Sequence, residues 1–296
     1  MGSNSGIERS RFVRTNITGN AIANEVRMKR TQHKGAFLVV EGVNDVRAMR
    51  AFVDSIACRV VIAYGKPNAL TALTILKSNA NGILGLLDAD FARVLGTVPQ
   101  DPNILLTDAH DMDAQLFFSP SLDKVLAEFS DQEKATAFAT AVGTDIRTRV
   151  AHAASVVGHL RLYSVQQRIG LNFEGLDFPA FLNKTLDVDE NVLLNNVIAR
   201  TSKCPVQVQD LKKALAVVRS KTFPPDQLCS GHDLVSILRL GLVNLFGAYN
   251  SRHLTLDALA GALRIAYSHE IFQTTTLYRD IREWEKRNQP FKILKI

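Results

Sequence analysis

The stretch Ala36-Phe37-Leu38-Val39-Val40-Glu41-Gly42 is a short apolar run, rich in β-branched residues, that ends at an acidic residue and a glycine. A run of this length and composition predicts a buried strand. Strands and helices then alternate at short intervals, which predicts a small parallel α/β sheet with right-handed crossovers. The expected strands are 36–40, 59–63, 83–87 and 103–106, and the expected helices are 44–55 and 67–77.

Beyond about residue 119 the pattern changes. Apolar residues recur at helical spacing, for example at Leu211, Leu215 and Val218, and predict a mostly helical second half. We therefore predict an α/β parallel sheet domain followed by a mostly α-helical C-terminal region. The predicted segments are a basic N-terminal segment 1–34, the sheet domain 35–118 and the helical domain 119–296.

The composition is that of an ordinary globular protein, with 46% hydrophobic and 22% charged residues. Three cysteines, Cys58, Cys204 and Cys229, lie far apart and are odd in number, so we expect no disulfide framework and a reducing compartment. The start of the chain lacks a signal-peptide pattern, and the apolar stretch 234–249 is interrupted and too short to span a membrane. We therefore expect a cytoplasmic protein without a membrane partner.

The net charge of +6 is unevenly distributed along the chain. Residues 1–34 carry +5, residues 35–118 carry −3 and residues 119–296 carry +4. A basic chain permits a nucleic acid or another polyanion as a partner. The acidic segment fits a carboxylate cluster that binds cations among groups that hold a polyanion, although charge fluctuations of this size also arise by chance.

Acidic residues follow the ends of the predicted strands. Glu41 ends the first strand, and Asp88 and Asp90 end the third. Ligands of a parallel α/β sheet bind outside the carboxyl ends of its strands. Because side chains at positions i and i+2 of an extended segment point the same way, Asp88 and Asp90 are predicted to face one site across from Glu41.

Carboxylates gathered at one edge repel one another and stay ionised when a cation neutralises them. Hard oxygen ligands, few in number and partly open, suit Mg²⁺ or Mn²⁺. The predicted ligands are Glu41, Asp88 and Asp90, with Asp45 and Asp113 as outer or second-metal ligands. Lys66 ends the second strand at the same edge and is predicted to stabilise charge that develops on a phosphate.

Each of these residues also has an ordinary structural interpretation. An aspartate at a strand end is often an N-cap or a turn former, and Asp45 fits the first turn of a helix equally well. Lys66 fits a solvated surface lysine equally well. For Glu41, Asp88 and Asp90 together the structural interpretation requires a coincidence at three positions, so we favour a shared functional site.

These residues resemble the pattern of a Toprim domain, which topoisomerases, primases and OLD-family nucleases share. That domain has a Glu after its first strand and an Asp-x-Asp after its third, here Glu41 and Asp88-Ala89-Asp90. More closely, the chain resembles the Toprim-like effector subunits of PARIS antiphage systems. Their pattern continues with an aromatic residue, a Thr-Asp segment and a Gly-His-Asp motif, here Phe91, Thr107-Asp108 and Gly231-His232-Asp233.

The resemblance implies a Mg²⁺-dependent nuclease that serves antiviral defence under the control of an ABC- or SMC-type ATPase partner. It implies DNA or RNA as substrate, tRNA included, and is compatible with a homodimer. The position of Asp113 is more often Glu in this family, and the shorter side chain would shift any metal contact made there. The alternative is a non-catalytic Toprim-fold module that docks an ATPase or a nucleic acid.

Other catalytic motifs are absent or incomplete in the sequence. A P-loop is not present, because Val60 stands where its first glycine would be and Pro67 follows Lys66. Cys229-x-x-His232 is half of a zinc site without a second close pair. Phosphatases of the haloacid-dehalogenase kind carry Asp-x-Asp after their first strand rather than their third, which disfavours that class.

Overall fold

The computed structural model describes residues 17–78 and 80–295. The chain divides into two compact units. We call the first the sheet unit, which comprises residues 17–78, 80–88, 98–108 and 269–295, and the second the helical unit, which comprises 89–97 and 109–268. The first part of the predicted basic segment, residues 1–16 with Arg9, Arg11 and Arg14, lies outside the described residues.

The sheet unit is built on four parallel strands. They are β1 (Ala36–Val40), β2 (Cys58–Ile62), β3 (Ile83–Leu87) and β4 (Ile104–Leu106), in the order β2-β1-β3-β4. The two central strands, β1 and β3, are buried at every position, which explains why both are uninterrupted apolar runs in the sequence. The predicted parallel sheet is confirmed, with β2 shifted by one residue from its predicted bounds.

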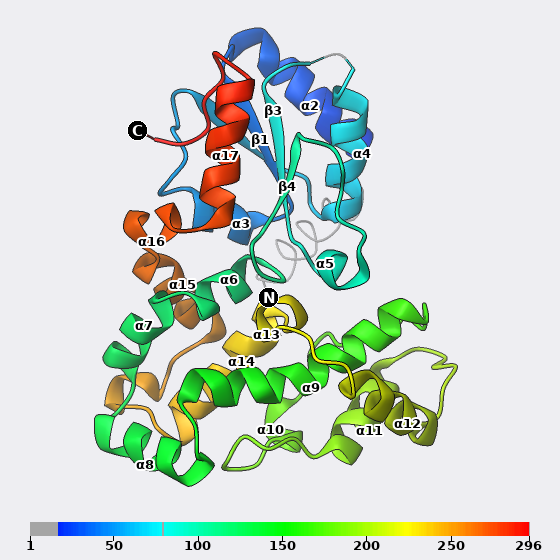
Figure 1. The fold of residues 1–296 in the computed structure, drawn as a ribbon, viewed down its shortest axis with the longest axis vertical. Coiled ribbons are helices and arrows are strands. Elements are labelled where there is room, and N and C mark those ends of the chain that lie inside the picture. The colour runs from blue at the N-terminus through cyan, green and yellow to red at the C-terminus, as the bar shows by residue number, and fades with distance from the viewer. Residues whose placement is uncertain (1–16, 79, 296) are drawn as a thin grey trace, which may run out of the picture. The chain divides into compact units, whose positions relative to one another are not determined.

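Helices cover the sheet on both faces. The helices among the described residues of this unit are α2 (Gly19–Gln32), α3 (Val43–Met49), α4 (Lys66–Leu76), α16 (His269–Gln273) and α17 (Thr276–Arg287). Figure 1 shows α2 and α4 on one side of the strands and α17 on the other. Gly85 of β3 permits this packing, because a Cβ there would lie 2.4 Å from a methyl group of Leu73 in α4.

The first predicted helix is shorter than its apolar spacing indicates. The spacing predicts a helix over 44–55, but α3 ends at Met49. Asp54 then forms an Asx turn, in which its Oδ1 accepts hydrogen bonds from the N–H groups of Ile56 (2.8 Å) and Ala57 (3.0 Å). Val53 pairs with Leu294 in an antiparallel bridge, so apolar residues beyond α3 serve packing against the chain end rather than helix formation.

The C-terminal segment belongs to the sheet unit. The apolar spacing predicts a helical domain over 119–296, whereas residues 269–296 group with the strands. Trp284 of α17 is fully buried, and its Nε1–H donates to Oδ1 of Asn103 (2.9 Å) just before β4. Both carboxylate oxygens of Asp108 accept hydrogen bonds from the start of α17, at the N–H groups of Thr276 (2.8 Å) and Leu277 (2.9 Å). Asp108 therefore caps a helix that is remote in the sequence.

The helical unit confirms the predicted change in character. Its α-helices are α5 (Ala92–Leu95), α6 (Met112–Phe118), α7 (Ser121–Phe129), α8 (Gln132–Val142), α9 (Ile146–Gln166), α10 (Phe178–Phe181), α11 (Glu190–Arg200), α12 (Val208–Arg219), α13 (Pro225–Leu228), α14 (Gly231–Asn244) and α15 (Leu256–Ala266). A bidentate pair joins α9 to α14, in which Nε and Nη2 of Arg161 each donate to Asp233 at 2.9 Å. No helix within 17–78 and 80–295 combines the length and apolar character needed to cross a bilayer.

Candidate catalytic site

Glu41 joins the carboxyl ends of three strands. It follows β1 directly, and its Oε1 accepts a hydrogen bond of 2.9 Å from the N–H of Asp88, which follows β3. Its main-chain carbonyl accepts a second hydrogen bond of 3.0 Å from Gly65, which follows β2. The half-buried Glu41 side chain is therefore fixed at the edge of the sheet where ligands of α/β proteins bind.

Both main-chain polar groups of Asp88, its N–H and its carbonyl, form hydrogen bonds with side chains of the site. Glu41 accepts from its N–H, and Nζ of Lys66 donates to its carbonyl oxygen at 2.6 Å. Lys66 is the first residue of α4, and Gly65 before it has a φ of 122°, a left-handed conformation that favours glycine. The structure thus brings Glu41, Lys66 and Asp88 together, as the sequence predicts.

Asp45 has an identified structural role at the start of α3. Its Oδ2 accepts a hydrogen bond of 2.7 Å from the N–H of Gly42, which satisfies a main-chain donor at the N-terminus of the helix. A carboxylate in this first turn is also favoured by the helix dipole. The capping interpretation of Asp45 therefore holds, and its role as a metal ligand stays a prediction.

Asp90 lies in the helical unit, at the sharp turn after β3. Its φ is 45°, which aspartate tolerates better than most residues, and its N–H donates to the carbonyl of His110 at 2.6 Å. Phe91, next to it, is buried and packs edge-on against the His110 ring at 4.7 Å between centroids. The aromatic residue after Asp-x-Asp thus fixes the turn that carries Asp90.

Asp111, which lies beside the predicted ligand Asp113, is the N-cap of α6. Its Oδ1 accepts from the N–H of Ala114 (2.8 Å) and its Oδ2 from the N–H of Gly231 (2.8 Å), so one carboxylate fixes the starts of α6 and α14. A Cβ on Gly231 would lie 2.3 Å from Oδ1 of Asp111, which explains the glycine. Burial raises the pKa of Asp111.

Asp113 faces a cation within the helical unit. Its Oδ1 lies 3.6 Å from Nη1 of Arg264 in the last turn of α15, and the Arg264 side chain is 10% exposed. A guanidinium this close offsets the negative charge of the carboxylate and repels a metal ion. Nothing in the sequence indicates this pairing, because the two residues lie far apart in the chain.

The oxygen donors at the carboxyl edge of the sheet suit a hard divalent cation. Glu41 and Asp88 offer carboxylates, and the hydrogen bond that Glu41 accepts would orient it as a ligand. Among the described residues, no three His, Cys, Asp or Glu side chains are close enough to form a metal-binding group as they stand. The donor chemistry therefore fits Mg²⁺ or Mn²⁺, and the complete set of ligands stays a prediction.

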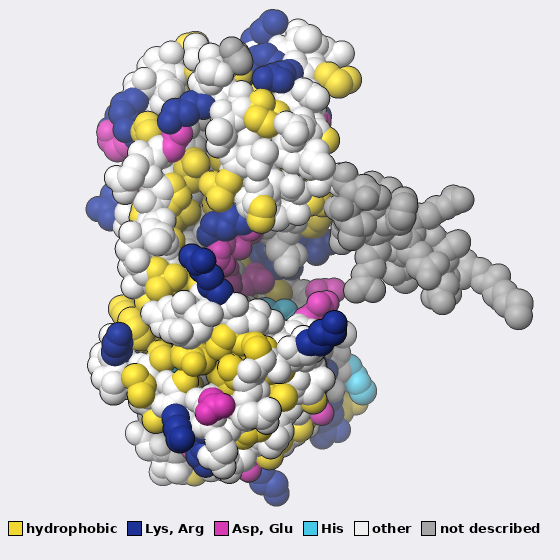
Figure 2. Space-filling model, turned by 90° about the vertical axis from the view of Figure 1, so that its right-hand side faces the viewer, with side chains coloured by type: hydrophobic (Ala, Val, Ile, Leu, Met, Phe, Trp, Pro, Cys, Tyr) yellow, Lys and Arg dark blue, Asp and Glu magenta, His cyan; other side chains and the backbone are white. Residues whose placement is uncertain are grey.

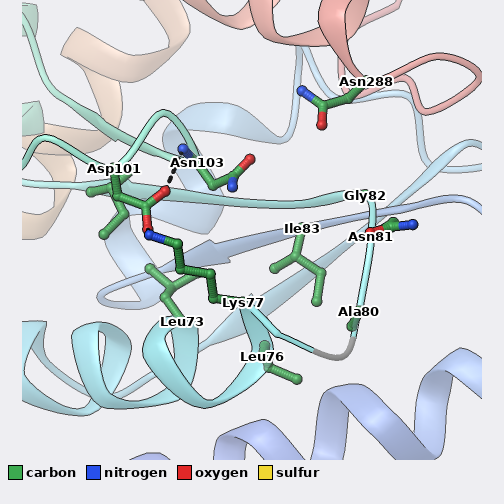
Figure 3. Close-up of a pocket in the computed structure, with 11 residues that line it drawn as sticks. Leu73, Leu76, Lys77, Ala80, Asn81, Gly82, Ile83, Asp101, Asn103 and Asn288 are labelled. Atoms are coloured by element: carbon green, nitrogen blue, oxygen red, sulfur yellow. Dashed lines mark hydrogen bonds and ion pairs between the residues drawn. The ribbon is translucent and has the colours of Figure 1, made fainter.

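A cavity of about 80 Å³ lies at the other end of the strands. Figure 3 shows Lys77 and Asp101 at its wall, where Nζ and Oδ2 form an ion pair of 2.8 Å. Asn103 and Asn288 also line it. Lys77 and Asp101 neutralise one another. The cavity lies near the amino ends of β3 and β4, so it is separate from the Glu41 and Asp88 edge.

The chain matches no model of a known protein family, and a search of curated proteins finds no match to it. The resemblance to Toprim domains therefore rests on the motif residues of this chain alone.

Proposed function

We propose that this protein is a Mg²⁺- or Mn²⁺-dependent nuclease with a Toprim-like sheet domain. The observation that carries the proposal is the contact of Glu41 and Lys66 with the main chain of Asp88 at the carboxyl edge of a parallel sheet. These contacts bring a carboxylate, a lysine and the main chain of a second acidic residue together from three separate segments, which supports metal-assisted hydrolysis of a phosphodiester.

In this proposal, Glu41 and Asp88 hold the divalent ion, and Asp90 is the further ligand that the Asp-x-Asp motif predicts. When bound, the ion would neutralise phosphate charge and lower the pKa of a water that attacks phosphorus. Lys66 adds a positive charge beside Asp88 and stabilises the negative charge that develops on the phosphate oxygens. The helix cap formed by Asp45 keeps the segment after Glu41 in place.

The order of the motifs supports the more specific proposal of an antiphage effector of the PARIS type. The four parallel strands are compatible with a Toprim domain, and Phe91 and Gly231 have structural roles that explain their positions in the motif. Control by an ATPase partner, assembly as a homodimer and a cytoplasmic location remain proposals that follow from the resemblance.

The proposal is tested by incubating purified protein with mixed DNA and RNA, tRNA included, in Mg²⁺, in Mn²⁺ and in EDTA. We expect cleavage with a divalent ion, none in EDTA, and none by the folded variants Asp88→Asn and Asp90→Asn. Equal cleavage by Asp88→Asn would remove the assignment. Normal binding of nucleic acid or of an ATPase without any cleavage would favour a docking module instead.

A further inference from the structure

The segments that lead into the strands meet at the amino-terminal edge of the sheet, opposite Glu41. The N–H of Ala36 donates to the carbonyl of Ala57 at 2.8 Å, which joins the segments before β1 and β2. Nη2 of Arg30, near the end of α2, donates to the carbonyl of Asn81 at 2.7 Å, which adds the segment before β3. Residues distant in sequence therefore form one continuous surface.

The chain end completes this surface. The N–H of Asp54 donates to the carbonyl of Ile293 at 2.8 Å, and Nζ of Lys295 donates to the carbonyl of Ala51 at 2.7 Å. The segment before β2 therefore lies against the segment that follows α17.

Exposed cations gather at this edge, and we call their surface the basic edge. Its members are Lys34, Arg59, Arg287, Lys292 and Lys295. Four of them donate to main-chain carbonyls, as Nη1 of Arg59 does to Ser55 (3.0 Å), and none of the five forms an ion pair within 4.0 Å of another described residue. Figure 2 shows Lys and Arg side chains at the top end of the sheet unit, the end at which α17 finishes in Figure 1.

The acidic residues near the basic edge are already engaged. Asp101 is paired with Lys77, and the carboxylate of Asp54 is bonded to two main-chain N–H groups. Glu285 is buried, and its Oε1 accepts from the N–H groups of Ile293 (2.6 Å) and Leu294 (2.7 Å). Two carboxylates do act on its cations: Asp54 lies near Lys292 and Lys295, and the exposed Glu283, which is paired with Lys286, lies near Arg287. The five cations of the basic edge therefore outnumber the carboxylates beside them.

We propose that the basic edge binds the phosphate backbone of a nucleic acid. Long, exposed Lys and Arg side chains are the usual donors to phosphate oxygens and need no fixed geometry for this role. A protein partner would require an apolar centre, but the exposed side chains of 31–35, 54–59 and 286–295 are polar or charged, apart from Ile56 and Pro290. The inference takes its class of ligand from the proposed function.

The basic edge and the proposed cleavage site lie at opposite ends of the strands, so the phosphates bound at the basic edge are distant from the phosphodiester that is cleaved. A strand of five residues spans about 17 Å, so the basic edge holds a part of the polymer roughly five nucleotides from Glu41 and Asp88. The basic edge then strengthens binding of long nucleic acids and leaves the chemistry on a very short one unchanged. In kinetic terms, loss of the basic edge raises KM for a long substrate and leaves kcat unaltered.

Binding is measured in EDTA by fluorescence anisotropy, with labelled duplex DNA and single-stranded RNA of about 40 nucleotides as probes, over a range of salt. The test variant is Lys34→Gln/Arg59→Gln/Lys292→Gln, and the control in the helical unit is Lys184→Gln/Lys213→Gln/Lys221→Gln, whose three lysines are also exposed. We expect the test variant to bind duplex DNA roughly 100-fold more weakly near 0.15 M salt, with a salt slope shallower by about 2 to 3.

The control variant, and Lys34→Arg/Arg59→Lys/Lys292→Arg, should bind within about threefold of the unchanged protein. Equal affinity and slope for the test and unchanged proteins would overturn the proposal, and so would an equal loss in the control. Competition by polyglutamate as strong as that of nucleic acid at equal charge would assign the edge to an acidic protein instead. Because EDTA prevents metal-dependent cleavage, this result is independent of whether the protein is a nuclease.

Discussion

Glu41 and Asp88 lie 47 positions apart in the chain, yet Oε1 of Glu41 accepts a hydrogen bond of 2.9 Å from the N–H of Asp88. The same carboxylate thus joins the ends of β1 and β3 and is the first candidate ligand for a divalent ion. Its structural and chemical roles can be separated, because an amide oxygen can replace the acceptor but not the negative charge.

Glu41→Gln should abolish activity and keep the fold. The amide oxygen can still accept from Asp88, so the free energy of unfolding should change by less than about 0.5 kcal/mol, whereas cleavage should fall by at least about 100-fold. Glu41→Ala removes the acceptor as well and should cost about 1–3 kcal/mol. Denaturant melts and single-turnover cleavage measure both effects, and normal cleavage by Glu41→Gln would exclude Glu41 as a ligand.

Lys66→Met should reduce cleavage about 100-fold, because the charge beside Asp88 is lost. Lys66→Arg keeps the charge and should retain most of the rate. The matched control is Lys213→Met, which changes an exposed lysine of α12. The variants are compared by their single-turnover cleavage rates at saturating Mn²⁺. Equal rates for the two methionine variants would show Lys66 to be an ordinary surface residue.

Much of the fold follows from local sequence. The buried strands β1 and β3 are uninterrupted apolar runs, and Gly65-Lys66-Pro67 indicates the start of α4. The position of α17 could not be predicted in this way. It depends on contacts between distant residues, such as the hydrogen bond from Trp284 to Asn103 and the capping by Asp108, which carry no local pattern.

The candidate site was predictable to a similar degree. Strand ends bring Glu41, Lys66 and Asp88 to one edge because parallel strands end together. Spacing could not distinguish a ligand from a cap, and it gave no indication that Asp111 fixes two helix starts or that Asp113 lies beside Arg264. Those roles are set by tertiary packing between helices of the helical unit.

Arg161→Ala should destabilise the helical unit by about 3–5 kcal/mol. Asp233 is 1% exposed, and loss of its bidentate partner would leave the buried carboxylate with only the distant Nδ1 of His232, 3.9 Å away. The double variant Arg161→Ala/Asp233→Ala should recover part of the loss, since no unpaired charge remains. Urea unfolding of the two variants provides the test, and a loss below about 1 kcal/mol in Arg161→Ala would contradict the interpretation.

Iodoacetamide at pH 8 should modify Cys204 and spare the other two cysteines. Burial raises the pKa of Cys58 and of Cys229 to about 12, so both thiols stay protonated and unreactive in the folded protein. Since the unfolded thiols ionise near pH 8.5, these groups favour the folded state below that pH, and the benefit is lost as the pH rises toward 12. Mass spectrometry of the labelled protein identifies the modified cysteines. Rapid labelling of Cys58 or Cys229 without denaturant would contradict the conclusion that both thiols are buried.

Titration with Mn²⁺, followed by the electron paramagnetic resonance of the free ion, tests the role of Glu41 and Asp88 most directly. A non-cleavable phosphorothioate oligonucleotide is included so that phosphate oxygens can complete the site. We predict that the unchanged protein binds Mn²⁺ at least tenfold more tightly than Glu41→Gln or Asp88→Asn, with Asp210→Asn, an aspartate of α12, as the matched control. Equal Mn²⁺ affinity in all four proteins would contradict the account.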